Sequence, residues 1–423
     1  MNIGVCGLGT VGSGVFNLLA DNADEIQRKT GKPVRIVQVG CRRDHPDVDL
    51  SDVAVTRDIF DVARHPEVDV VLELIGGTDD ALSLVLLAIE QGKHVVTANK
   101  ALIALHGDEV FSAAERAGVQ VRYEAAVAGG IPIIKAIREG LAANQIDWLA
   151  GIINGTTNYI LSEMEQPGSN LAFADVLAEA QRLGYAEADP TFDVEGIDAA
   201  HKLTILSTIA FGGPLVFDSM YTEGISEITS SDMDYADELG YRIRHLGITR
   251  RTSKGIELRV HPTLVAKNDM LAQVHGVMNA VMVGSNAADA TMYYGPGAGA
   301  GPTASSVMAD VIDVMRGGVV PNLGFTDLQE IEIVPISEIV TSYYLRLQVA
   351  DERGVMARLT TILSEHDISI EALIQKDARG GNAEIVLVTD EVKESAVDTA
   401  LLDLESLEEV LGNVSRIRIT SLN

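Results

Sequence analysis

The chain has 423 residues, of which 47% are hydrophobic and 22% charged, and this composition excludes a disordered or collagen-like protein. The length allows about two to four domains with an ample buried core. Asp and Glu number 61 against 32 Lys and Arg, a net charge of -29, and aromatic residues make up only 4%. So acidic a surface repels phosphate backbones and anionic lipid, so neither nucleic acid nor a membrane is expected as a partner.

The cysteines and the N-terminus bear on the compartment. Cys6 and Cys41 are the only two cysteines in the sequence, too few for a disulfide framework and without metal-ligand spacing. The N-terminal apolar stretch has no basic residues ahead of it and is interrupted by glycines, and no run of about 18 apolar residues occurs. We therefore expect no signal peptide, no transmembrane helix and a cytoplasmic location.

Apolar runs that alternate with helical patterns fill the first 124 residues. Strands are expected at residues 2–6, 34–41, 68–75, 94–98 and 119–124, with helices after residue 9 and at 81–91 and 108–117. This alternation is typical of βαβ units and predicts an α/β fold with a Rossmann-like, doubly wound parallel sheet.

After Gly129-Gly130 the pattern changes to mixed α+β. Strands are expected at 146–154, 256–264 and 276–283, and helices at 132–141, 157–165, 172–183, 198–211 and 304–316. From residue 343 the order βαββαβ predicts a ferredoxin-like unit, with strands at 343–350, 368–375, 383–389 and 414–420 and helices at 354–366 and 393–404.

These patterns predict the domain organisation. We expect a nucleotide-binding domain of residues 1–130 plus about 302–320, a catalytic and dimerisation domain of 131–301, a linker at 317–342 and a regulatory domain of 343–423. The helix after Pro302 is expected to pack back on the nucleotide-binding domain, which makes that domain discontinuous.

A glycine-rich loop follows the first expected strand. Gly7-Leu-Gly9-Thr-Val-Gly12 matches the pattern GxGxxG directly before a helix. Gly7 permits the tight turn, Gly9 lets the backbone approach a pyrophosphate, and Gly12 allows close packing of helix on strand. The loop predicts a dinucleotide site, the alternative being a structural turn.

The end of the second expected strand bears on which dinucleotide is bound. Cys41-Arg42-Arg43 stands where an NAD site usually has a carboxylate that accepts from the ribose 2′-OH. A guanidinium pairs instead with a 2′-phosphate, which favours NADP. Asp44 keeps NAD open, and a solvated loop is the other interpretation of the two arginines.

Residues 180–202 carry the strongest constellation of charged side chains. Asp198 and Lys202 are four residues apart, so they project from one face of a helix. As an exposed ion pair they would be worth at most about half a kcal/mol. The residues that follow, LTILSTIAFG, are apolar nearly all round and must be buried. A charged pair at the mouth of a buried helix indicates a functional site.

The same segment resembles a known family. The spacing A-x3-G-Y-A-x2-D-P-x2-D-V-x-G-x-D-x3-K from Ala180 to Lys202 resembles the signature of homoserine dehydrogenase. IGVCGLGTVGSGV at the start, VVTANKALIA (95–104), AGGIPIIKAI (128–137) and INGTTNYIL (153–161) resemble that family too. The tail DERGVMARLTTILSEHDISIE (351–371) resembles an ACT domain, an amino-acid-sensing βαββαβ module. The resemblance covers essentially the whole chain.

The resemblance implies a reaction and roles for three residues. Members of the family reduce L-aspartate 4-semialdehyde to L-homoserine with NAD(P)H, on the route to threonine, methionine and isoleucine. Hydride arriving at the aldehyde carbon leaves charge on oxygen, so the site needs a cation and a proton source. Lys202 matches the catalytic lysine, Asp198 orients it and binds substrate, and Lys100 contacts cofactor and substrate. Without the resemblance, Lys100 would be interpreted as a solvated lysine at the end of a strand.

Further residues match family positions. Glu187 matches the carboxylate that receives the substrate ammonium, and Gly184 supplies a backbone contact to substrate and cofactor. The remaining cofactor-binding residues are expected to be Thr10, Val11, Arg42, Arg43, Gly76, Gly77, Thr78 and Gly301, beside Gly7, Gly9, Gly12 and Lys100; Gly299 is expected close by.

The resemblance also implies a monovalent-cation site. Glu124, Val127, Gly129 and Ile131 match it, and mostly main-chain oxygens at this spacing suit a hard ion such as sodium. From the residues alone the stretch is only a strand followed by a glycine turn.

The ACT resemblance implies regulation and assembly. ACT modules pair side by side and bind an amino acid near the first strand–helix loop, here Asp351–Gly354. Threonine, the end product, is the expected effector, and a homodimer or homotetramer is the expected assembly. The alternative is a structural dimerisation module.

Two other classes of function stay open at this point. A different NADP-linked oxidoreductase would keep the glycine loop without needing Asp198, Lys202 and Glu187. A non-catalytic sensor of metabolic state would not need the intact lysines and carboxylates.

Overall fold

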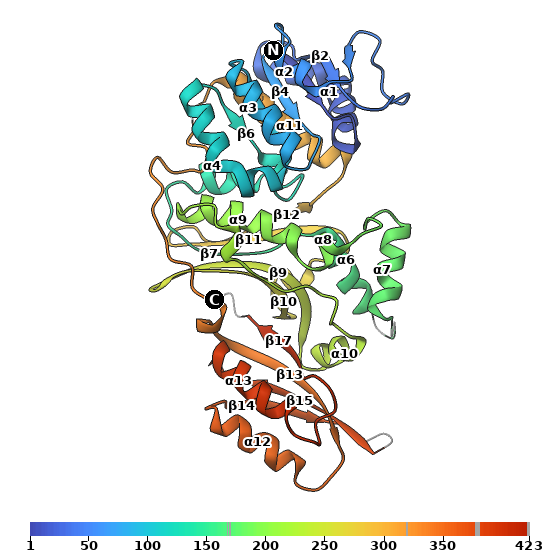
Figure 1. Cartoon of the computed structure of the whole chain (residues 1–423), viewed down its shortest axis with the longest axis vertical. Helices are drawn as coiled ribbons and strands as arrows, with labels where there is room; N and C mark the ends of the chain where they lie inside the picture. The colour runs from blue at the N-terminus through green and yellow to red at the C-terminus, as the bar shows by residue number, and fades with distance from the viewer. Residues whose placement is uncertain (167, 169–170, 319, 377–380, 421–423) are drawn as a thin grey trace.

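The structure is a computed structural model that describes residues 1–166, 168, 171–318, 320–376 and 381–420. Figure 1 shows three units stacked along the longest axis: the N-terminal unit at one end, helices on a large sheet in the middle, and the C-terminal unit at the other end. The predicted fold class is confirmed, because a Rossmann-like parallel sheet, a mixed α+β unit and a ferredoxin-like unit follow one another along the chain.

The N-terminal unit is a parallel sheet covered by helices. Its elements are β1 (Asn2–Cys6), α1 (Thr10–Thr30), β2 (Arg35–Gly40), β3 (Ala54–Thr56), α2 (Ile59–Arg64), β4 (Val70–Glu73), α3 (Asp79–Glu90), β5 (His94–Thr97), α4 (Lys100–Ala117) and β6 (Val121–Arg122). Within the described residues the strands lie in the order β3-β2-β1-β4-β5-β6, all parallel. The carboxyl ends of β1, β4 and β5 therefore meet at one edge, where ligands of such sheets bind.

One helix of this unit starts earlier than the sequence indicated. The helix expected at 108–117 runs from Lys100, because Asn99 caps it: the backbone N–H of Leu102 donates to Asn99 Oδ1 at 3.1 Å. The apolar residues of the added turns, among them Leu102 and Ile103, are fully buried. Lys100 is therefore held at the first turn of a helix.

The middle unit contains most of the irregular elements. Its bounds are η1 (Glu124–Ala126), α5 (Ile133–Lys135), the π-helix η2 (Ala136–Gly140), β7 (Ile146–Ile152), α6 (Gly155–Met164), α7 (Phe173–Arg182), α8 (Thr191–Val194), α9 (Ile197–Phe211), η3 (Phe217–Ser219), β8 (Tyr221–Thr222), α10 (Ser230–Glu238), β9 (Tyr241–Thr252), β10 (Gly255–Ala266), η4 (Leu271–Gln273), β11 (Met278–Ser285), β12 (Asp289–Pro296) and α11 (Ala300–Arg316). The helix expected at 132–141 is a short α5 that continues as a π-helix.

Strand β9 was not predicted, although it pairs with β10 along its whole length. Arginines interrupt its apolar pattern. Their partners come from elsewhere in the chain: Arg244 binds Glu165, the C-cap residue of α6, and Arg250 binds Glu257 of β10. Because these partners are distant in the sequence, the apolar pattern alone does not predict the strand.

Helix α11 returns from the middle unit to the N-terminal sheet. Its buried side chains Val307 and Val311 share a core with Val5 and Val39 of the sheet. In α1, a Cβ on Gly14 would lie 2.3 Å from the carbonyl oxygen of Ala300, so a glycine is needed where the two helices touch. The expected domain boundaries stay predictions.

The C-terminal unit has the predicted βαββαβ order, with one short extra strand. Its elements are η5 (Ile336–Glu338), β13 (Val340–Ala350), α12 (Val355–Glu365), β14 (Ile370–Gln375), β15 (Asn382–Thr389), β16 (Val392–Lys393), α13 (Glu394–Glu405) and β17 (Ser415–Ile419). Strand β17 pairs with β10, with Arg418 opposite Thr263. Among the described residues one sheet therefore runs through both units, in the order β12-β11-β7-β9-β10-β17-β13-β15-β14.

The segment at 317–342, expected to be a linker, lies against the middle unit. The backbone N–H of Gln329 donates to the carbonyl of Gly212, and Ile333 forms a bridge with Ile256 of β10. Its two prolines and three glycines explain the lack of regular helix or strand before η5, but its described part is hydrogen-bonded to the unit that it follows.

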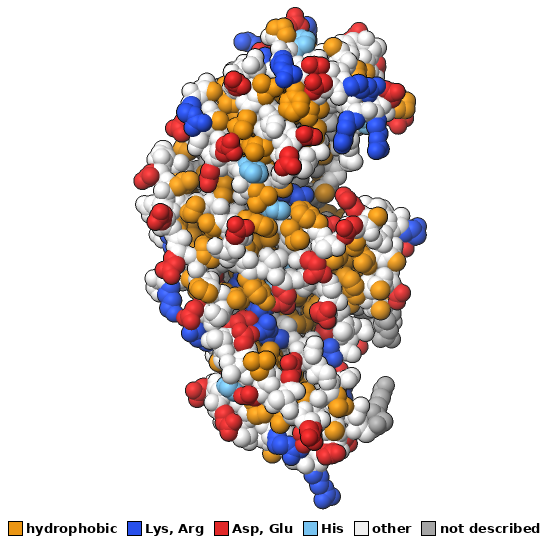
Figure 2. Space-filling model, in the orientation of Figure 1, with side chains coloured by type: hydrophobic (Ala, Val, Ile, Leu, Met, Phe, Trp, Pro, Cys, Tyr) orange, Lys and Arg blue, Asp and Glu red, His pale blue; other side chains and the backbone are white. Residues whose placement is uncertain are grey.

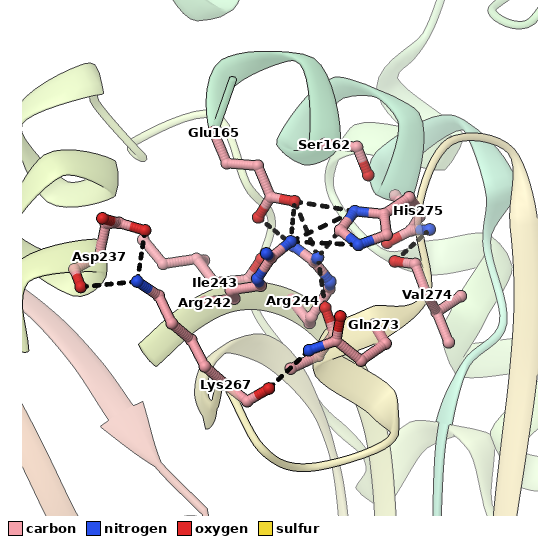
Figure 3. Close-up of polar contacts among 12 residues, drawn as sticks. Ser162, Glu165, Asp237, Arg242, Ile243, Arg244, Lys267, Gln273, Val274 and His275 are labelled. Carbon is pink, nitrogen blue, oxygen red and sulfur yellow. Dashed lines mark hydrogen bonds and ion pairs between the residues drawn. The ribbon is translucent and has the colours of Figure 1, made fainter. Parts of the chain in front are cut away.

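An ion cluster fixes the C-terminal end of α6 to β9 (Figure 3). Glu165 accepts from Arg244 at 2.7 Å and from Arg242 at 3.0 Å, and His275 Nδ1 lies 3.0 Å from the same carboxylate. The side chain of Arg244 is fully buried, so its charge depends on Glu165. The cluster holds α6 in place, and the N-cap of this helix is Asn154, a residue of the site described below.

Cys6 and Cys41 are buried free thiols. No helix in the described part of the chain has both the length and the hydropathy that crossing a bilayer requires.

Candidate active site

The glycine loop has the shape that a dinucleotide requires. Gly7 has φ +97°, and a Cβ there would lie 2.5 Å from the carbonyl oxygen of Leu74. A Cβ on Gly12 would lie 2.2 Å from the carbonyl oxygen of Gly7, so this glycine lets helix pack on loop. At Gly9 nothing lies within 4 Å, and the first turn of α1, with Thr10 and Val11, has no side-chain cap. The space beside Gly9 is open to a phosphate at a helix N-terminus.

A cleft of about 600 Å³ extends from this loop along the edge of the sheet. Arg42, Arg43 and Arg57 line it, and Asp44 forms an ion pair with Arg57. Figure 2 shows Lys and Arg side chains gathered where the N-terminal unit overlooks a hollow between it and the middle unit. The cleft is thus a basic site on a strongly acidic protein.

The loop after β4 is held by two residues that the sequence analysis missed. Glu73, fully buried, accepts from the backbone N–H groups of Ile75 and Gly76 at 3.0 and 3.2 Å. Burial raises the pKa of the Glu73 carboxyl. Asn99 donates to the carbonyl of Gly77 at 2.7 Å. These bonds shape the expected cofactor loop Gly76–Thr78, and a glutamate ending an apolar strand was the available signal.

Two lysines and one aspartate meet below this edge. Asp198 Oδ2 accepts from Lys202 Nζ at 2.6 Å, and Asp198 Oδ1 lies 3.0 Å from Lys100 Nζ. Lys202 Nζ also donates to the carbonyl of Ile153 at 2.7 Å. Because an ammonium has three N–H groups, one on Lys202 is left for a further acceptor. The exposed fraction is 4% for the side chain of Asp198, 11% for Lys202 and 34% for Lys100.

The charges in this cluster stabilise one another. Burial works to raise the pKa of the Asp198 carboxyl, but Lys202 and then Lys100 outweigh it and hold that pKa well below its usual range. Asp198 in turn raises the pKa of Lys100, and the charges of Asp193 and Glu187 act in the same direction. The Lys100 ammonium also lies 5.5 Å from the centre of the Phe192 ring. Asp198 is therefore an anion under all ordinary conditions.

Asn154 and Asp193 belong to the same cluster, although sequence reasoning assigned them no role. Asn154 Nδ2 donates to Asp198 Oδ2 and to Asp193 Oδ1, both at 2.8 Å. Its own Oδ1 accepts from the backbone N–H of Thr157 and so caps α6. Asp193 belongs to the 180–202 motif, and Asn154 belongs to the segment INGTTNYIL. Both residues therefore lie in segments that resemble the family.

Gly184 and Glu187 lie in the exposed loop between α7 and α8. Gly184 has φ +77°, a conformation that favours glycine. The structure does not bring Glu187 into direct contact with the two lysines, but its charge acts on Lys100. The loop is anchored by the hydroxyl of Thr156, which donates to the carbonyl of Tyr185 at 2.7 Å.

The predicted cation residues surround a strained turn. Ala128 and Gly129 have φ of +54° and +48°, and a Cβ on Gly129 would lie 2.3 Å from the carbonyl oxygen of Gly297. This contact brings the loop of residues 297–301, which contains Gly299 and Gly301, against the turn. At Gly301 nothing lies within 4 Å of a built Cβ.

Glu124, beside this turn, is buried close to a second carboxylate. Its two oxygens accept from the backbone N–H groups of Ile134 and Lys135, both at 2.9 Å, and its own N–H donates to Asp310 at 2.7 Å. Burial, with a contribution from Asp310, raises the pKa of Glu124 to about 8. Burial likewise raises the pKa of Asp310 to about 7. The described residues contain no cluster of three His, Cys, Asp or Glu side chains that could hold a metal.

Three family models match consecutive parts of the chain. A model of the homoserine dehydrogenase NAD-binding domain matches residues 7–124, a homoserine dehydrogenase model matches 132–312, and an ACT domain model matches 343–409.

Whole proteins of the same kind are similar from end to end. Homoserine dehydrogenase of Pseudomonas aeruginosa is 58% identical over 100% of this chain and 99% of its own, and that of Neisseria gonorrhoeae is 52% identical over the same shares. The crystal structure of a homoserine dehydrogenase from Thiobacillus denitrificans superposes with a TM-score of 0.94 at 52% identity, covering 100% and 99% of the two chains. A hyperthermophilic archaeal homoserine dehydrogenase in complex with NADPH matches 78% of this chain and 99% of its own at 25% identity, with a TM-score of 0.62.

Proposed function

The chain belongs to the homoserine dehydrogenase family and is an oxidoreductase acting on a CH–OH group, and from this premise we propose that it reduces L-aspartate 4-semialdehyde to L-homoserine with NADPH. The reaction adds a hydride to the aldehyde carbon and a proton to the aldehyde oxygen. It is reversible and lies on the route to threonine, methionine and isoleucine. One observation carries the proposal: the Lys202 and Lys100 ammoniums share the buried carboxylate of Asp198 beside the nucleotide-binding sheet.

The proton step falls to Lys202. Asp198 and the carbonyl of Ile153 hold its Nζ at 2.6 and 2.7 Å, which leaves one N–H to donate to the developing alkoxide. Asp198 stays an anion because of its two lysines, so it orients the ammonium and does not compete for the proton. Lys100, the more exposed of the two, stands at the start of α4 and adds a second positive charge to stabilise the developing alkoxide.

The proposed cofactor is NADPH, with NADH as the alternative. The reduced nicotinamide, when bound, supplies the hydride. The open space beside Gly9 fits a pyrophosphate, with Thr10, Val11 and Gly76–Thr78 around it. Arg42 and Arg43 line the cleft and fit a 2′-phosphate, while Asp44, the residue that would favour NAD, is paired with Arg57. The relative solved in complex with NADPH supports the same choice.

Substrate recognition is assigned to the loop between α7 and α8. Glu187 is the proposed partner of the substrate α-ammonium, because it is exposed and because its charge raises the pKa of Lys100. Gly184 offers backbone groups at the same loop, and Asp198 is the second carboxylate within the site.

A monovalent cation, sodium in our proposal, is assigned to the carbonyl oxygens of Val127, Gly129 and Ile131 beside Glu124. The residues fit this group: two buried carboxylates, Glu124 and Asp310, have pKa values raised by burial, and a cation beside them would compensate their charge. The ion would hold the turn that packs against the Gly297–Gly301 loop.

The C-terminal unit is proposed to bind threonine and to pair with a second copy in a homodimer or homotetramer. The ACT model match and the Asp351–Gly354 loop support this assignment. The N-terminus of α12, with Gly354 at φ +93°, could receive the ligand carboxylate.

The test is the loss of NADPH absorbance with purified enzyme and aspartate semialdehyde. Succinate semialdehyde, which lacks the α-ammonium, is the matched control. We expect turnover of aspartate semialdehyde only. The Glu187→Gln variant should have a higher KM for aspartate semialdehyde, which reduces the difference in turnover between the two aldehydes. Equal turnover of the two aldehydes, or none of the first, would contradict the proposal.

A further inference from the structure

A buried arginine joins the C-terminal unit to the middle unit. Arg418 of β17 is fully buried and has carboxylate partners on both sides. Its Nε donates to Glu394 at the start of α13 at 2.9 Å, and its Nη1 donates to Glu223, directly after β8, at 2.7 Å. Nη2 also donates to the hydroxyl of Tyr221 at 3.0 Å. One cation therefore depends on a carboxylate from each unit.

Glu223 belongs to a segment that lies along β10. Tyr221 and Thr222 pair with Arg259 and Val260, and the backbone N–H of Glu223 donates to the carbonyl of Val260 at 2.8 Å. Strand β17 pairs with the same strand a few residues further on. The hydroxyl of Tyr221 donates to Glu223 at 2.6 Å, so the carboxylate is aimed at Arg418.

The next residues of this segment contact the start of the catalytic helix. The backbone N–H of Ile225, itself fully buried, donates to the carbonyl of Val194 at 2.9 Å, and Ser226 donates to Glu195. A Cβ on Gly224 would lie 2.6 Å from the carbonyl oxygen of Val194, so the two backbones are in direct contact. Residues 193–196 lead straight into α9.

A second contact runs through His245. Its Nε2 lies 3.0 Å from the carbonyl oxygen of Glu223, and its ring would be 3.0 Å from a Cβ on Gly196. Gly196, with φ +83°, is the N-cap of α9, and Asp198 stands two residues later. On the other side, Asp193 and Asp198 share the amide of Asn154. The position of Asp198 is thus set by a stretch that residues 224–226 contact directly and that Glu223 reaches through His245.

We propose that Glu223 is a positioning residue for Asp198, and that the Arg418–Glu223 contact transmits the state of the C-terminal unit to the catalytic helix through residues 223–226. Ligand binding that moves β17 or α13 would pull on Arg418 and so displace the start of α9. The effector part rests on the proposed function, whereas the positioning part needs only a working active site.

The test compares Glu223→Ala with Glu223→Gln. Alanine removes the contact, while glutamine keeps an oxygen that accepts from Arg418, and Glu223 is 31% exposed, so neither variant buries an empty cavity. We expect E223A to lower kcat/KM for aspartate semialdehyde about tenfold, since small misplacements of catalytic groups have large effects. The KM for NADPH should stay unchanged, and E223Q should recover most of the loss. Hydrogen exchange of the amides at 194–200 should rise in E223A alone.

Glu338→Ala is the matched control. Glu338 also links the two units, through an ion pair with Lys254 at 3.4 Å, but it does not contact the 193–196 stretch. We expect normal kcat/KM and normal exchange at α9 in this variant. Unchanged kcat/KM in E223A, or equal losses in E223A and E338A, would overturn the positioning role.

A threonine titration separates the two parts of the proposal. In the wild type, threonine should raise the Tm and lower the rate of turnover. In E223A, threonine should still raise the Tm, but the fold-decrease in rate should be at least about threefold smaller than in the wild type. If threonine has no effect on the wild type, the effector assignment fails, while the kinetic comparison of E223A and E223Q still decides the positioning role. Full inhibition of E223A by threonine would overturn transmission through Glu223.

Discussion

The buried carboxylates Glu124 and Asp310 give a pH-dependent stability that sodium should control. They are 2% and 1% exposed, and burial raises the pKa of Glu124 from 4.5 to about 8 and that of Asp310 from 3.8 to about 7. A carboxyl whose pKa is raised by folding stabilises the protein below its unfolded pKa, and this stabilisation is lost as the pH rises through its folded pKa. Without a bound cation, stability should therefore fall between about pH 4 and about pH 8.

The size of the effect follows from the same values. Each pKa unit is worth about 1.36 kcal/mol, so the raised pKa of Glu124 corresponds to roughly 5 kcal/mol lost on ionisation. A cation that binds only the folded, ionised site returns about 2.7 kcal/mol when it is present at about 100 times its Kd. For a protein of this size, that free energy is expected to raise the Tm by at least about 3 °C.

The assay is thermal unfolding across about pH 5 to 9, with either sodium or N-methylglucamine as the only monovalent cation. We expect the Tm to fall steeply with pH in N-methylglucamine and less steeply in sodium. Glu124→Gln removes one titrating group, so it should flatten the slope in N-methylglucamine and weaken the response to sodium. Identical slopes in both buffers and in the variant would refute both the ionisation argument and the cation site.

Three further predictions concern the cofactor cleft and the lysine cluster. Replacing both Arg42 and Arg43 by alanine should raise the KM for NADPH about tenfold, because hydrogen bonds to charged groups contribute about 1.5–3 kcal/mol each, and should leave the KM for NADH nearly unchanged. Equal losses for both cofactors in steady-state assays would contradict a 2′-phosphate role. Asp198→Asn should lower kcat about 10²-fold or more, and because Asp198 raises the pKa of Lys100, the alkaline limb of the pH–rate profile should move to lower pH; an unmoved limb would count against the charge coupling. Asn154→Ala should lower the Tm, as loss of an N-cap costs about 1 kcal/mol, and should reduce kcat without changing the KM for NADPH. Normal kcat in that variant would show that Asn154 is only a cap.

The fold was predictable where its pattern is local. The glycine loop, the alternation of the first five expected strands with helices and the βαββαβ tail depend on neighbouring residues. Apart from α4, which begins at Lys100 and not at residue 108, these elements lie within a few residues of their expected bounds. Strand β9 escaped prediction because Arg244 and Arg250 are neutralised by Glu165 and Glu257, partners that only the folded chain brings near. The pairing of β10 with β17, which joins two units in one sheet, has no sequence signal at all.

The same distinction applies to the site. The spacing of Asp198 and Lys202 on one helical face predicted their contact. The contact of Lys100 with the same carboxylate, that of Asp198, depends on how α4 packs against α9. The roles of Asn154 and Glu73 depend on the groups to which they hydrogen-bond in the folded chain. Residues that support a site through such bonds leave no regular spacing.

The most direct measurement is the turnover of aspartate semialdehyde by Lys202→Ala, together with fluorescence titration of NADPH binding. Lys267→Ala is a suitable companion, because that ammonium pairs with Asp237 outside the site. We predict that K202A loses at least about 10²-fold in kcat while its Kd for NADPH and its fold stay those of the wild type, and that K267A turns over normally. Near-normal turnover by K202A would mean that the ammonium held by Asp198 does not supply the proton.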